Sequence, residues 1–278
     1  DGDWGEEVEL DQDRLAGLKG YDYQSMLSRM NASPSLVFSQ YYHDFTKELI
    51  GREIESYLAA KPRATILELA CGHGQMASYV ISRLHDRAEV TYLMTDIIED
   101  SLKKSEAHYS RTGFHPPEEL LPFCCDGERL PLPGKSVDIV FLMEAIEHFE
   151  RPFAGFREFH RVLKPGGLCL VTTPRPSQSW FRFRVDLLGR LFPYQGYAKH
   201  LMIDYSICDE NFHRYIQENG FRELKRRFFS VNWPLANYPL LRLLHFPALV
   251  RLYAAFNLRI LSRFFPLFRK AQFRVLEK

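Results

Sequence analysis

The stretch that decides the fold reads Ile66-Leu67-Glu68-Leu69-Ala70-Cys71-Gly72-His73-Gly74-Gln75. It begins as an apolar run typical of a buried strand, passes through two glycines and continues into helical spacing from Met76. A strand, a tight turn and a helix N-terminus together form a cradle for a nucleotide-like ligand. Glu68 within the strand would repel a pyrophosphate and attract a cation. The cradle therefore favours a nucleotide-like ligand that carries positive charge.

Strand-like runs separated by helical segments continue this pattern along the chain. They cover residues 65–70, 90–95, 120–125, 137–143 and 167–172. Strands that alternate with helices predict an α/β fold with a doubly wound parallel sheet. The segment Lys164-Pro165-Gly166-Gly167 is predicted to be a turn that feeds the fifth strand.

The biological ligand that combines adenosine with positive charge is S-adenosylmethionine (SAM). The acidic residue followed by spaced glycines, together with the Lys-Pro-Gly-Gly turn, resembles the class I SAM-dependent methyltransferases. The resemblance covers about residues 40–230 and the final strand. It implies a Rossmann-like, mostly parallel seven-stranded sheet, with residues 221–231 and 272–276 as its last strands. Ala70 stands where the family usually has its first glycine, and alanine suits that position if its φ stays negative.

A set of residues at the strand ends is predicted to bind SAM. Asp96 ends the second strand 22 residues after Gly74 and can accept both ribose hydroxyls. The alternative is that Asp96 caps the helix expected over residues 99–109. The resemblance implies that Asp126 accepts a hydrogen bond from the adenine amino group and that Ile97 packs on the ring. A plain Asp-Gly turn is the alternative for Asp126. The predicted cofactor-binding residues are Glu68, Ala70, Gly72, Gly74, Asp96, Ile97, Asp126, Gly127 and Glu144.

The fourth strand runs into a Glu-x-x-Glu-His cluster made of Glu144, Glu147 and His148. Two methyltransferase groups carry this cluster with a later histidine, which is His200 here: the ubiquinone-biosynthesis O-methyltransferases and the small-RNA 3′-end 2′-O-methyltransferases. The resemblance to the first group implies catalytic roles for Glu147, His148 and His200. It also implies that these three residues and Glu144 hold Mg²⁺, Mn²⁺ or Zn²⁺, which oxygen-rich ligation suits. In the metal-free alternative, Glu144 contacts SAM and His148 accepts a proton.

The rest of the chain is predicted to flank or elaborate this domain. Residues 1–37 form an acidic, irregular extension, whose first thirteen residues carry seven acidic and no basic side chains. The methyltransferase domain spans 38–278 and opens with a helix over 38–60. It includes substrate loops at 173–205 and an amphipathic insertion at 232–270. From residue 222 onward there are twelve Lys and Arg against two Asp and Glu.

These features predict methyl transfer from SAM to an oxygen of a small hydroxylated or lipid-like molecule, at or near a membrane. The basic, aromatic insertion suits an anionic membrane surface, with a lid or a subunit contact as alternatives. No apolar run is long enough to span a bilayer. The pattern of five unpaired cysteines indicates a cytoplasmic protein, peripherally attached at most. An RNA 2′-O-methyltransferase is an alternative that the apolar insertion disfavours. A non-catalytic SAM-binding partner subunit is another.

Overall fold

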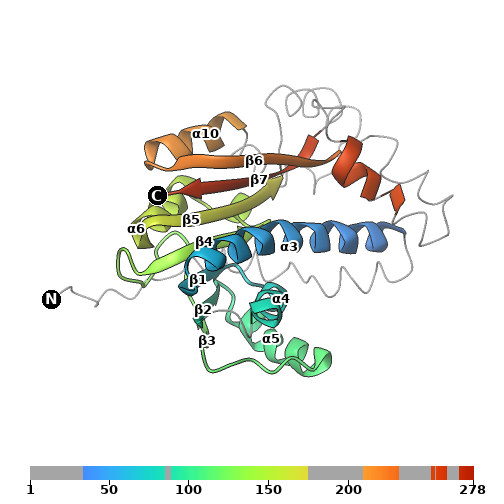
Figure 1. The fold of residues 1–278 in the computed structure, drawn as a ribbon, viewed down its shortest axis with the longest axis horizontal. Helices are drawn as coiled ribbons and strands as arrows, with labels where there is room; N and C mark the ends of the chain where they lie inside the picture. Colours follow the sequence, from blue (N-terminus) through green and yellow to red (C-terminus); the bar gives the residue numbers. More distant parts are fainter. Residues whose placement is uncertain (1–33, 85–88, 175–208, 232–251, 254, 262–268) are drawn as a thin grey trace.

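The computed structural model describes residues 34–84, 89–174, 209–231, 252–253, 255–261 and 269–278 (Figure 1). Most of the predicted acidic extension and nearly all of the predicted substrate loops lie outside these ranges. So do His200 and most of the predicted amphipathic insertion. The described residues form one sheet with helices on both of its faces.

The sheet has seven strands in the order β3-β2-β1-β4-β5-β7-β6. Their bounds are β1 (Arg63–Leu69), β2 (Glu89–Asp96), β3 (Leu120–Cys124), β4 (Val137–Met143), β5 (Leu163–Pro174), β6 (Arg222–Val231) and β7 (Arg269–Glu277). All pairs are parallel except those made by β7, which runs antiparallel to both β5 and β6. The strand order reverses between β1 and β4, and ligands bind at such switch points in open α/β sheets. The predicted doubly wound, mostly parallel seven-stranded sheet is confirmed.

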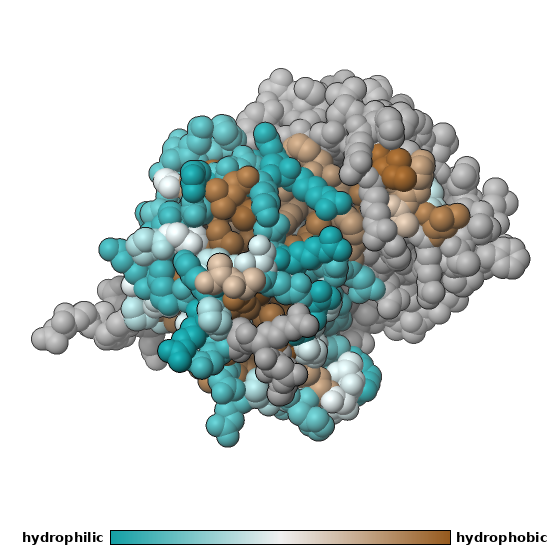
Figure 2. Space-filling view, viewed as in Figure 1, coloured by the Kyte–Doolittle hydropathy of each residue, from teal (hydrophilic) through white to brown (hydrophobic). Residues whose placement is uncertain are grey.

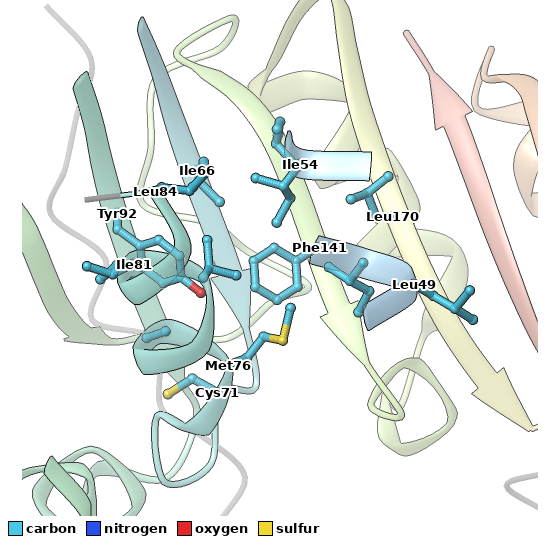
Figure 3. Packing of buried hydrophobic residues seen from close by; sticks show 14 of the residues in the cluster. Leu49, Ile54, Ile66, Cys71, Met76, Ile81, Leu84, Tyr92, Phe141 and Leu170 are labelled. Atoms are coloured by element: carbon cyan, nitrogen blue, oxygen red, sulfur yellow. The ribbon is translucent and has the colours of Figure 1, made fainter. Parts of the chain in front are cut away.

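The helices divide the core into two layers. They are α3 (Pro34–Ala60), α4 (Gln75–Leu84), α5 (Glu99–Thr112), α6 (Pro152–Val162) and α10 (Asp209–Glu218), with a short 3-10 turn η1 (Ile146–His148) and a π-helical turn η3 (Asn257–Leu261). Alternate strand residues point to opposite faces, so Ile66 packs with α3, α4 and α5 while Leu67 packs with α6 and α10. Figure 3 shows Phe141 at the centre of the first layer, between residues of α3 and α4.

The fifth strand begins earlier than predicted. The Lys-Pro-Gly-Gly segment lies inside β5, whereas the sequence predicts a turn that precedes the strand. The glycines still have a structural reason, because Gly166 has a φ of 73° and a Cβ on Gly167 would lie 2.8 Å from the Asp138 carbonyl oxygen. The β4–β5 register shifts between Val137 and Ile139. Between Val137 and Ile139 of β4, the paired residues of β5 advance from Leu163 to Leu168, so the Lys-Pro-Gly-Gly segment is an irregular part of the strand.

The last two strands pair as predicted, although residues 232–268 separate them in the sequence. The η3 turn, which lies within this separating segment, packs against β6. Among the described residues, no helix has the length and apolar character that crossing a membrane requires.

Candidate cofactor and acceptor site

The predicted cofactor residues gather where the parallel strands end. Asp96 closes β2, and its Oδ2 accepts the Gly72 N–H at 2.9 Å while its Oδ1 accepts the Ile98 N–H at 2.9 Å. Ile98 is the N-cap of α5, so Asp96 ties the glycine turn to the start of that helix without being its cap residue. Burial raises the pKa of Asp96, and the N–H bonds oppose that shift. A carboxylate can accept about four hydrogen bonds, so Asp96 can still accept one from a ribose hydroxyl.

Three residues of the turn after β1 have left-handed backbone conformations. Gly72 and Gly74 have φ values of 54° and 69°, and Ala70 has a φ of 53°. The favourable condition for alanine at this position, a negative φ, is therefore not met. A Cβ in the left-handed region costs roughly 1–2 kcal/mol. The turn carries this strain directly beside the predicted ligand.

Replacing Ala70 by glycine is expected to raise the free energy of unfolding by about 1 kcal/mol, because glycine adopts this φ without a steric penalty. The greater freedom of glycine in the unfolded chain offsets part of the gain. Ala70→Val should lower stability instead, because a β-branched side chain is worse at positive φ. Urea unfolding of both variants measures the difference. Equal or lower stability of Ala70→Gly would contradict a strained alanine.

Position 74 requires glycine for two reasons, its positive φ and a side chain that lies too close for a Cβ. A Cβ on Gly74 would overlap the Tyr109 hydroxyl and lie 2.8 Å from Cζ of the same ring. Tyr109 comes from α5, is buried, and directs its hydroxyl at the Met94 sulfur 3.1 Å away. The Gly74 N–H also donates to the Cys71 carbonyl at 3.0 Å, which closes the turn. The turn is therefore packed tightly on α5.

Glu68 lies under this turn with 4% of its surface exposed. Its Oε2 accepts a hydrogen bond from the Tyr92 hydroxyl at 2.7 Å. Burial raises the pKa of Glu68 to about 8, the charge of Asp96 adds to the rise, and the Tyr92 hydrogen bond opposes it. The carboxyl group is therefore mostly uncharged at neutral pH when no ligand is bound.

The Asp126-Gly127 loop follows β3 beside the end of β2. The Asp126 Oδ1 accepts the Glu128 N–H at 2.9 Å, which is the geometry of an Asx turn. A Cβ on Gly127 would lie 2.6 Å from Cζ of Phe149, so this glycine lets the loop approach the segment after β4. This Asx turn agrees with the alternative of a plain Asp-Gly turn, and hydrogen bonding of Asp126 to adenine stays a prediction.

The Glu-x-x-Glu-His cluster does not share one helical face. Glu144 has a φ of 52° and its N–H donates to the Thr172 carbonyl at 3.0 Å. Glu147 is buried and accepts a hydrogen bond from the Thr173 hydroxyl at 3.2 Å, whereas His148 is exposed. Glu147 and His148 lie in the 3-10 turn η1, whereas Glu144 precedes that turn.

The structure describes three of the four predicted metal ligands, Glu144, Glu147 and His148. Within the part of the chain that the structure describes, no group of three or more His, Cys, Asp or Glu side chains is arranged to hold a metal ion. His200, the fourth predicted ligand, lies outside the described residues. The described members do not by themselves fit a metal, and metal binding stays a prediction.

Tyr42 of α3 is a site residue that the sequence reasoning missed. Burial is the largest of the causes that raise the pKa of Tyr42 well above its usual value. The charge of Glu144, a hydrogen bond to Glu144 and the charge of Glu147 raise this pKa further. Tyr42 therefore stays a phenol that donates towards the carboxylates after β4. The available signal was spacing, because Tyr42 lies three residues before Phe45 on the buried face of the predicted helix.

Known proteins are similar to this chain in sequence and in fold. Residues 67–171 match the family model described as "Methyltransferase domain". The malonyl-[acyl-carrier protein] O-methyltransferase of Marinomonas sp. is 30% identical over 146 residues, which cover 50% of this chain and 51% of that protein. A ubiquinone/menaquinone biosynthesis C-methyltransferase of Bordetella parapertussis is 30% identical over 173 residues, which cover 59% of this chain and 62% of that protein. The chain thus spans only half to two thirds of these relatives.

A solved structure shows the same fold with low identity. The [4+2]-cyclase SpnF has a TM-score of 0.54 and 18% identity, covering 83% of this chain and 80% of that one. The fold and the turn after β1 are those of the class I SAM-dependent methyltransferases, which confirms the predicted resemblance. Residues 67–171 of this chain are a methyltransferase domain of that class. Since a cyclase shares the fold, the reaction must be argued from the site.

Proposed function

We propose that this chain binds SAM and transfers its methyl group to an oxygen of a small hydroxylated or lipid-like molecule. The observation that carries the proposal is the glycine turn held to Asp96, whose Oδ2 accepts the Gly72 N–H at 2.9 Å. This contact fixes a carboxylate beside the glycine turn, next to the switch point between β1 and β4, and ligands bind at such points in open α/β sheets. The match of residues 67–171 to a methyltransferase family supports SAM as the ligand.

The residues after β4 and β5 support a proton-accepting role towards the methyl acceptor. Attack on SAM by a hydroxyl group requires that its proton be removed, and a positioned carboxylate can accept it. Glu144 and Glu147 follow β4, at the carboxyl ends of the parallel strands. Tyr42 donates a hydrogen bond to Glu144, and Thr173 donates one to Glu147. These donors fix the carboxylates in place. One relative is named an O-methyltransferase and another a C-methyltransferase, so the choice of oxygen rests on this chain's carboxylates.

The experiment is a transfer assay with SAM labelled with carbon-13 in its methyl group. Acceptors are catechols with and without a long alkyl chain, and the carbon-13 shift of the product separates O-, N- and C-methyl groups. We expect an O-methyl product, and Glu147→Gln should lower kcat by about 10²–10⁴-fold. A C-methyl product would overturn the choice of oxygen. Binding of SAM without turnover on any acceptor would favour a non-catalytic subunit, and turnover on an RNA oligonucleotide would favour the RNA alternative.

Chelation tests the predicted metal separately. If Glu144, Glu147, His148 and His200 hold a divalent ion, it would lower the pKa of the acceptor hydroxyl. Excess EDTA should then abolish transfer, and Glu147→Ala should match the chelated enzyme. Full activity in EDTA would exclude a required metal, and the carboxylates would remain as the proton acceptors.

We also propose that the region around η3 contacts an anionic membrane. The described residues here expose Leu252, Phe256 and Ile260, at 68%, 44% and 41%. In Figure 2, some of the apolar patches lie at the upper right, where Figure 1 draws the red turn η3. The chain from residue 222 onward has twelve basic against two acidic residues. Apolar side chains within a basic segment suit an anionic lipid surface.

Replacing Phe256 by serine is expected to lower retention on phosphatidylserine vesicles by about tenfold or more, since burying a large apolar side chain contributes roughly 1.5–3 kcal/mol. The matched control is Leu121→Ser, because Leu121 is similarly exposed, at 45%, but lies on the opposite edge strand β3. Vesicle flotation measures both variants. Equal retention of the two variants would show that η3 is not the contact. A lack of retention of the unmodified chain would show that no such surface is recognised.

A further inference from the structure

Glu68 is an acidic side chain set into an apolar layer. It shares its strand face with Ile66, and its register partners on the neighbouring strands are Met94 and Phe141, both buried. Figure 3 shows Tyr92, whose hydroxyl donates to Glu68 at 2.7 Å, on the same side of the sheet as Phe141 and Met76. One neutral donor and apolar neighbours stabilise a charged carboxylate poorly.

The titratable groups around Glu68 are neutral or acidic. Tyr92 and Asp96 act on it from β2, Cys71 from the glycine turn and Tyr109 from α5. From α4 and β4, the neighbours in the same core are apolar, among them Met76 and Phe141. Among the described residues, none of the groups that act directly on Glu68 is basic, and His73 of the glycine turn acts on the neighbouring Asp96. A cation that stabilises the carboxylate would therefore have to come from the ligand.

We propose that Glu68 senses the charge of the bound cofactor, losing its proton when the sulfonium of SAM binds and keeping it when the sulfide of S-adenosylhomocysteine binds. This inference rests on the proposed function, because it requires SAM to occupy the cradle above β1. The released proton passes to the solvent. Methyl transfer converts the sulfonium to a neutral sulfide, so the product no longer compensates a buried carboxylate. Glu68 thus distinguishes the substrate cofactor from its product by charge.

The direction of the pH dependence follows from the burial of Glu68. The carboxyl group has a raised pKa, about 8, so it is protonated near neutral pH in the ligand-free protein. A nearby positive charge favours the carboxylate and lowers that pKa. Binding that releases a proton strengthens as pH rises, by up to about tenfold per pH unit below the pKa of the free protein. SAM affinity should therefore increase from about pH 6 to about pH 8, while the affinity for S-adenosylhomocysteine changes much less.

The experiment is isothermal titration of the full chain with SAM and with S-adenosylhomocysteine, in phosphate and in Tris at the same pH. The two buffers differ in ionisation enthalpy, so the difference in measured heat counts the protons released. We expect SAM to release at least about half a proton more than S-adenosylhomocysteine near neutral pH. Glu68→Gln should remove this difference. Tyr92→Phe removes the donor to the carboxylate, which raises its pKa, so the extra release should persist and move to higher pH.

Two results would overturn the inference while SAM binding itself stands. One is equal proton release with both ligands, which would mean that the shared ammonium group, and not the sulfonium, sets the charge of Glu68. The other is a SAM-specific release that survives in Glu68→Gln. If Glu68→Gln does not fold, the shift expected for Tyr92→Phe decides the question. Failure of both ligands to bind would instead contradict the proposed function, and the inference with it.

Discussion

Replacing Gly74 by alanine is expected to abolish measurable cofactor binding and to lower the free energy of unfolding by roughly 2–5 kcal/mol. The φ of 69° adds backbone strain, and the new Cβ would overlap the Tyr109 hydroxyl. Tyr109 cannot easily move, because its ring is buried and packs edge-on against Phe114 at 4.9 Å. The glycine turn would therefore have to move to relieve the overlap. This movement would break the hydrogen bond from the Gly72 N–H to Asp96. Titration with S-adenosylhomocysteine and urea unfolding measure the two effects.

Gly113 provides a matched control for this variant. It has the same φ of 69° and caps the C-terminus of α5, and a Cβ added to it would meet no atom within 4 Å. Gly113→Ala should cost only the strain, roughly 1–2 kcal/mol, and leave ligand affinity unchanged. Adding Tyr109→Phe to Gly74→Ala should recover part of the stability, because it removes the overlapping hydroxyl. Equal losses in the two alanine variants would show that the contact with Tyr109 is unimportant.

Asp96→Asn is expected to raise the Kd for S-adenosylhomocysteine by at least about 100-fold, equivalent to about 2.7 kcal/mol. Both oxygens of Asp96 accept backbone N–H groups, from Gly72 and Ile98. In either orientation an amide would point its NH₂ group at one of these donors. The variant therefore loses a turn contact together with one acceptor for the ribose, and hydrogen bonds to charged groups are the stronger kind.

Asp138 is the matched control for the loss of a buried carboxylate. Its Oδ2 accepts the Thr65 N–H at 2.9 Å and the Lys164 ammonium at 2.6 Å, and it is 8% exposed. It is the second residue of the central strand β4, so it lies near the amino ends of the parallel strands, whereas the predicted site lies at their carboxyl ends. Asp138→Asn should destabilise the chain but leave the Kd for S-adenosylhomocysteine within about twofold. A loss of affinity as large as that of Asp96→Asn would mean that the effect reflects general destabilisation.

The strands were predictable because burial on both faces leaves continuous apolar runs. The run 137–143 coincides with β4, and the weaker final pair was found through the family resemblance. The conformation of Ala70 was not predictable, because a residue with a Cβ gives no signal for a positive φ. The sequence also does not indicate that Glu147 is buried while its neighbour His148 is exposed, because this difference depends on how the short 3-10 turn η1 packs.

The contribution of α3 to the site could also not be predicted from the sequence. Tyr42 reaches Glu144 through the packing of α3 across the strands, a contact between residues about one hundred positions apart. The pairing of Tyr92 with Glu68 likewise depends on the β1–β2 register, which local patterns do not fix. Side chains that support the predicted site residues thus required the tertiary structure, while the residues at the strand ends did not.

The most direct test of the central claim is a competition titration of the full chain with S-adenosylhomocysteine and NAD⁺. The sulfonium of SAM is positive and the pyrophosphate of a dinucleotide is negative, so the two ligands would act oppositely on a carboxylate beneath the cradle. We expect that S-adenosylhomocysteine saturates one site per chain, that SAM displaces it and that NAD⁺ does not compete. Saturation by NAD⁺ or NADP⁺, with no competition from S-adenosylhomocysteine, would contradict a cradle built for a sulfonium nucleoside.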